Sequence, residues 1–64
     1  MDEDLKLLEG LRERYLSRLG SAVSNAYYKH YHDLLLEVEG LLEKFHAEGL
    51  SDEDLARVRE LSDD

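Results

Sequence analysis

Apolar residues recur every three or four positions along most of the chain, which is the spacing of one face of an α-helix. In the first segment they are Leu5, Leu8, Leu11, Tyr15, Leu16 and Leu19. Acidic residues precede this segment and arginines occupy its second half, an order that suits the helix dipole. The pattern predicts a helix over residues 3–19, and Gly20 is its expected end.

The middle segment carries the longest apolar pattern and predicts a helix over residues 22–47. Ser21 or Ser24 can provide its N-cap. Seven apolar residues form its central seam, and Leu35 and Leu42 widen the seam to an arc of roughly 120°. The seam consists of Val23, Tyr27, Tyr31, Leu34, Val38, Leu41 and Phe45. This width is typical of a helix in a bundle rather than of a two-stranded coiled coil.

A turn at Gly49-Leu50-Ser51 predicts a third helix over residues 52–61. Gly49 can adopt the left-handed conformation that ends a helix, with Leu50 folding back on the last turn. Ser51 followed by Asp54 three residues later resembles a capping box. The apolar positions of this helix are Leu55, Val58 and Leu61.

These elements predict a single all-α domain over residues 1–64, built as an antiparallel helical hairpin with a short third helix. The alternative, one continuous helix over 3–47, requires a coiled coil. We expect three pairs to meet between the first two helices: Leu19 with Val23, Tyr15 with Tyr27, and Leu8 with Leu34. We expect the third helix to fold back toward Leu41 and Val38. Because so short a hairpin covers the wide seam poorly, assembly into a helical bundle is expected.

Gly10 and Gly40 lie inside the helical patterns. Each lowers helix stability by roughly 1 kcal/mol relative to Ala. Exposure to solvent is the simpler interpretation, and close approach of another backbone is the alternative.

Charge narrows the functional classes. The 64 residues include 16 acidic and 8 basic side chains and no Cys, for a net charge of −8. This charge argues against direct binding of nucleic acid or of an anionic membrane. The sequence shows no transmembrane helix or signal peptide, and a cytoplasmic location is expected. The basic residues cluster between Arg12 and Lys29, whereas the start of the chain and residues 33–54 are acidic.

A metal site is a weaker hypothesis. Glu43 and His46 have the Glu-x-x-His spacing of di-iron helical bundles, and further potential ligands lie on the same flank. The candidates are His32, Glu39, Glu43 and His46. Because they flank the apolar seam instead of pointing into a core, we expect no metal and no cofactor.

The segment from Tyr27 to His32 combines three Tyr and two His, and Tyr is enriched in binding hot spots. No nucleophile beside an oriented base is evident, so we expect no catalytic residue and no enzyme activity. The expected partner-binding residues are Tyr27, Tyr28, Tyr31, Leu34, Leu35, Val38 and Leu42.

The sequence therefore favours a non-enzymatic protein-protein interaction or oligomerisation module. The expected partner is a second copy in an antiparallel homodimer, or a helix of another protein. The uneven distribution of charge along the chain would favour the antiparallel orientation of the two copies. Two alternatives stay open: an acidic inhibitor that mimics a nucleic acid, and a carboxylate–His metal-binding bundle.

Overall fold

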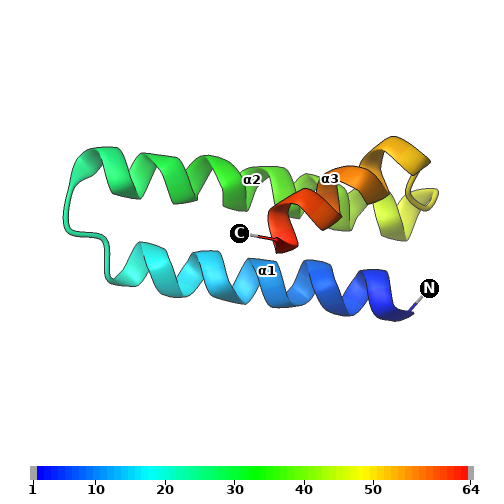
Figure 1. Cartoon of the computed structure of the whole chain (residues 1–64), viewed down its shortest axis with the longest axis horizontal. Coiled ribbons are helices and arrows are strands. Elements are labelled where there is room, and N and C mark those ends of the chain that lie inside the picture. The colour runs from blue at the N-terminus through cyan, green and yellow to red at the C-terminus, as the bar shows by residue number, and fades with distance from the viewer. Residues whose placement is uncertain (1, 64) are drawn as a thin grey trace.

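The computed structural model describes residues 2–63 and places three α-helices in them, with no β-strand in that range. The helices are α1 (Asp2–Gly20), α2 (Asn25–Ala47) and α3 (Asp52–Ser62). The predicted all-α class is confirmed. Helices α1 and α2 lie side by side and run in opposite directions, and α3 folds back over them from the far end of α2 (Figure 1). None of the helices in this range has the length and apolar character needed to cross a membrane.

Helix α2 begins three residues later than the pattern predicts, at Asn25 instead of Ala22. The hydroxyl of Ser24 accepts a hydrogen bond from the Tyr27 backbone N–H at 3.1 Å, which caps the helix there. Val23 consequently lies in the connecting segment with 91% of its surface exposed, so it does not belong to the apolar seam.

The end of α1 explains why the connection takes four residues. The Ser21 hydroxyl donates to the Ser17 carbonyl oxygen at 3.2 Å, and the Ala22 N–H donates to the Leu19 carbonyl oxygen at 3.3 Å. These bonds satisfy carbonyl groups that the last turn of a helix otherwise leaves without partners. Residues 21–24 therefore belong to the connection between α1 and α2.

The longer connection changes which side chains of α1 and α2 meet. We expected Tyr15 beside Tyr27, but the ring that packs on Tyr15 belongs to Tyr31, with centroids 5.8 Å apart. Tyr27 packs on Tyr31 from the next turn, at 4.9 Å. The expected Leu19–Val23 pair is excluded by the exposure of Val23. Because the connection takes four residues, the residues of α2 that face α1 lie about one helical turn later in the sequence than predicted.

The turn before α3 agrees with its prediction. Gly49 has a φ of 86° and is the only residue of the described range with positive φ. Ser51 and Asp54 form the full capping box: the Ser51 hydroxyl accepts from the Asp54 N–H, and the Asp54 carboxylate accepts from the Ser51 N–H. Leu50 packs against the core. This local geometry starts α3 one residue after the cap.

The core lies where all three helices meet. Its centre is formed by Leu8 of α1, Val38 of α2 and Val58 of α3, each no more than 1% exposed. The remaining buried residues are Leu11 and Tyr15 of α1, Leu35 and Leu41 of α2, and Leu61 of α3. Burying one such aliphatic side chain contributes about 1.5–3 kcal/mol, so this cluster provides most of the driving force for the fold.

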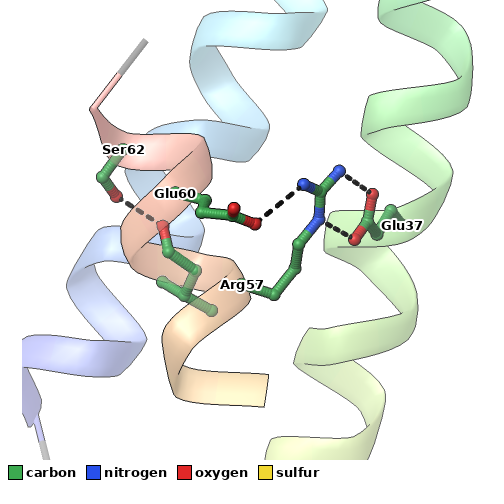
Figure 2. A network of polar contacts seen from close by, with 5 residues as sticks. Glu37, Arg57, Glu60 and Ser62 are labelled. Carbon is green, nitrogen blue, oxygen red and sulfur yellow. Dashed lines mark hydrogen bonds and ion pairs between the residues drawn. The ribbon is translucent and has the colours of Figure 1, made fainter. Parts of the chain in front are cut away.

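Ion pairs connect α3 to α2 at the edge of this core. Figure 2 shows Arg57 of α3 reaching Glu37 of α2 with two hydrogen bonds, of 2.5 and 2.9 Å, while Glu60 contacts the same guanidinium at 3.3 Å. Lys44 lies 2.6 Å from the capping carboxylate of Asp54. The hydrogen bond from Arg57 lowers the pKa of Glu37, and the one from Lys44 lowers the pKa of Asp54.

Candidate functional site

The candidate site is the part of the α1–α2 pair that α3 leaves uncovered. Helix α3 has 11 residues against 23 in α2, and it ends well short of the 21–24 connection (Figure 1). Beyond its end lies a cavity of about 710 Å³, which we call the open-end cleft. It is lined by Arg14, Tyr15, Arg18, His30, Tyr31, Leu34 and Ser62. Because Ser62 is the last residue of α3, the cleft continues the line of that helix.

The floor of the open-end cleft is aromatic. The rings of Tyr15 and Tyr31 pack at 5.8 Å with a tilt of 46° between their planes. Tyr15 is buried, whereas Tyr31 and the neighbouring Leu34 are half-buried. Tyrosine rings tolerate such a position because they bury an apolar body and keep a polar tip near water. The floor therefore offers apolar contact without being closed to solvent.

The rim of the cleft is basic. Arg14 and Arg18 stand on the α1 bank, and His30 on the α2 bank packs its ring edge-on against Tyr31 at 4.9 Å. Within residues 2–63 neither Arg14 nor Arg18 forms an ion pair; the ion-paired cations are Arg12, Lys44 and Arg57. None of the described lining residues is acidic, although the whole chain has twice as many acidic as basic side chains.

The expected partner-binding residues are divided among three environments. Leu35 and Val38 lie in the core with exposures of 7% and 0%, so they are not part of a surface that a partner can reach. Tyr31 and Leu34 line the open-end cleft, and Tyr27 packs beside Tyr31. Tyr28 and Leu42 lie on another flank of α2, where Tyr28 stacks on His32 and half-buried Leu42 lines a hollow with Arg12 and Glu39.

That other flank borders a second uncovered face of the α1–α2 pair. Tyr28 is 49% exposed and stacks on His32 at 5.9 Å, and Leu16 is 42% exposed. Arg12 and Glu39 bridge the two helices at 3.6 Å. The hollow beside this bridge includes Glu43 among its lining residues, so its charges are mixed. This face has apolar surface but no preference for one sign of charge.

The four potential metal ligands do not gather into a site. Among residues 2–63, no three His, Asp or Glu side chains lie close enough together to hold a metal ion. His32 stacks on Tyr28, and His46 packs edge-on against Phe45 at 5.8 Å. Glu39 pairs with Arg12, and Glu43 borders the mixed-charge hollow.

Sequence reasoning missed the α1 bank of the cleft. It identified a basic stretch from Arg12 to Lys29 and expected this charge to orient a dimer, but it did not include Arg14, Arg18 or His30 among the partner-binding residues. The signal was present in the spacing: Arg14 and Arg18 are four residues apart and therefore share one flank of α1. Comparison with protein families, with curated proteins and with solved structures finds no match for this chain.

Proposed function

We propose that this chain is a non-enzymatic protein-interaction module that binds an acidic amphipathic helix in the open-end cleft. The observation that carries the proposal is the combination in one cleft of a tyrosine floor and a basic rim, with no carboxylate among the described lining residues, in a chain of net charge −8. Tyr and Arg are the residue types most enriched in binding hot spots.

Helix α3 illustrates how a helix is held on this surface. It inserts Val58 and Leu61 into the core and adds two ion pairs to α2 at its edge, Arg57 with Glu37 and Asp54 with Lys44. A guest helix placed beyond Ser62 would use the same two types of contact. Its apolar ridge would cover Tyr31 and Leu34, and its carboxylates would meet Arg14 and Arg18. Binding of an amphipathic helix in an apolar groove is a common mode of recognition.

The charge distribution also favours this location for such a guest. An acidic helix is repelled by most of this chain and attracted by the basic rim. Complementary charge of this kind accelerates association and sets the binding register more than it raises affinity. The interaction should therefore weaken as salt is added, since exposed charges are screened over about 10 Å at 0.1 M salt.

The test is a titration of the isotope-labelled chain, at low micromolar concentration, with a synthetic helix. The probe carries Leu at helical spacing on one face and Glu on both flanks. Amide signals of residues around Arg14, Arg18, His30 and Tyr31 should shift. The variant Arg14→Glu/Arg18→Glu should bind at least tenfold more weakly. Arg59→Glu, an exposed charge reversal on α3, is the matched control and should bind normally.

A second peptide, with Lys in place of every Glu, distinguishes recognition of charge from nonspecific apolar binding. It should leave the spectrum unchanged. Shifts centred on Tyr28 and Leu42, or equal responses to the acidic and the basic peptide, would contradict the proposal.

A further inference from the structure

We infer that the occupant of the open-end cleft is the acidic start of α1 from a second copy of this chain, paired antiparallel with the first. This inference rests on the proposed function and names its partner. The observations come from one flank of α1, which we call the pairing flank. It consists of Glu3, Leu7, Gly10, Arg14 and Arg18.

The pairing flank is accessible along the length of α1. Leu7 is 40% exposed, so its side chain is accessible to a partner. A Cβ atom built on Gly10 would meet no atom within 4 Å. Successive hollows follow the same flank: one beside Glu3, Lys6 and Leu7, one that includes Lys6, Leu7, Gly10 and Arg14, and then the cleft itself.

The flank is complementary to itself when two copies run in opposite directions. If the two-fold axis passes between positions 10 and 11, Glu3 of each copy lies opposite Arg18 of the other. Leu7 then lies opposite Arg14, at the entrance of the partner's cleft. A two-fold pairing makes each of these contacts twice. In a parallel pairing, Glu3 would face Glu3 and Arg18 would face Arg18, which is unfavourable.

Gly10 has a specific role in this arrangement. It lies at the centre of the pairing, where the two helix axes approach most closely. A residue without a side chain permits that approach. The chain thus supplies what the cleft requires of its occupant: carboxylates at Glu3 and half-buried Asp4, and a leucine one turn later.

The experiment is a charge exchange followed by sedimentation, over concentrations from the micromolar range upward. The unchanged chain of 7.4 kDa should approach twice that mass as its concentration rises. Glu3→Arg alone and Arg18→Glu alone should each stay monomeric at concentrations where the unchanged chain is dimeric. A mixture of these two variants should regain the dimer as a one-to-one pair, because both facing positions are again opposite in charge.

Glu13→Arg is the matched control, since it makes the same charge change on an exposed position of α1 away from the pairing flank. It should dimerise like the unchanged chain. Circular dichroism of each variant separates loss of pairing from loss of folding. The double variant Glu3→Arg/Arg18→Glu should dimerise by itself.

Cross-linking tests the geometry independently, because the chain has no native Cys. A one-to-one mixture of the variants Leu7→Cys and Arg14→Cys should form an inter-chain disulfide under mild oxidation, because these positions face each other in the pairing. Ser21→Cys should not, since two such positions would lie about 30 Å apart at 1.5 Å per residue. Cross-linking through Ser21→Cys, or failure of the mixed variants to pair, would overturn the inference. A chain that stays monomeric yet binds the acidic peptide in its cleft would overturn the inference and leave the proposed function standing.

Discussion

The two ends of the α1–α2 pair are built differently although the same two helices form both. At the closed end, where α3 is added, Leu8, Val38 and Val58 are almost completely buried. At the open end, two helices alone hold Tyr15, Tyr27 and Tyr31 in a row of tilted rings. Aliphatic side chains form the centre of the core, from which water is excluded. At the open end Tyr27 and Tyr31 are half-buried beside the buried Tyr15.

The difference shows what a third helix contributes to so small a chain. Two helices can bury one strip of each other, but the middle helix has a wide apolar face that a single neighbour cannot cover. Helix α3 packs against the part of this face around Val38 and Leu41. At the uncovered part, Tyr31 of α2 meets Arg14 and Arg18 of α1 in the open-end cleft, and both residue types are enriched at binding surfaces. The closed end therefore accounts for stability, and the open end is the region available for a partner.

The largest effect should come from a cavity at the closed end. Leu8→Ala should reduce the free energy of unfolding by about 3 kcal/mol, because the fully buried side chain leaves a void. Leu16→Ala, at a leucine that is 42% exposed, should reduce it by under about 1 kcal/mol. Urea unfolding followed by circular dichroism measures both. Equal losses would show that the two ends do not differ in packing.

Two glycine substitutions should have opposite signs. Gly49→Val should destabilise the chain by about 2 kcal/mol, since a β-branched residue strongly disfavours a φ of 86°. Gly40→Ala should stabilise it by about 1 kcal/mol, because Gly40 is an exposed helical residue with open space around its Cα. Thermal melts report both changes. A stabilising Gly49→Val would mean that the turn before α3 is not left-handed in solution.

The helix caps should give a smaller difference between the ends. Ser24→Ala and Ser51→Ala should each lower the free energy of unfolding by about 1 kcal/mol, because each hydroxyl satisfies a backbone N–H. Only Ser51 belongs to a capping box. In its variant, the hydrogen exchange of backbone amides should rise at the start of α3, around Asp54 and Leu55. In the Ser24 variant it should rise at Tyr27 and Tyr28. Exchange that rises at the same residues in both would contradict separate caps.

The smallest effect is expected in the pH dependence of the free energy of unfolding, through an ion pair at the closed end. Arg57 lowers the pKa of Glu37 below its ordinary value of 4.5. In the unfolded chain this carboxyl takes up its proton at higher pH, so the stabilisation is complete above about 4.5 and is lost as the pH falls through the lower, folded-state pKa. Arg57→Gln should flatten this part of the stability profile. Urea unfolding from pH 6 to pH 3 for both chains is the measurement, and identical profiles would count against the ion pair.

Features set by a few neighbouring residues could be predicted from the sequence. Gly49 and the Ser51–Asp54 capping box need only residues within one turn, and the structure confirms both. The start of α2 was less certain because Ser21 and Ser24 are both good caps. The choice of Ser24 moved the facing positions, so Tyr15 meets Tyr31. A pairing of distant residues depends on the length of the connection, which the apolar pattern does not specify.

The site could be predicted only in part, for the same reason. Tyr31 and Leu34 were expected at a binding surface and do line the cleft. Leu35 and Val38 have the same apolar character, yet the α1–α3 packing buries them. The pair Arg57–Glu37 joins residues 20 positions apart, and the chain offers many other carboxylates. The positions of α1 and α3 on α2 together decide which of these residues are covered and which remain exposed.

The connection at residues 21–24 has a consequence for how the polypeptide can be divided. It lies at the tip of the molecule, remote from the core, and Val23 within it is 91% exposed. Joining the two helices there mainly saves the entropy of bringing them together, since the core contacts do not involve this segment. The chain can therefore be divided at this connection. Residues 1–22 and 24–64, produced as separate peptides, should bind each other and rebuild the same core. Their affinity would report the strength of the α1 interface directly.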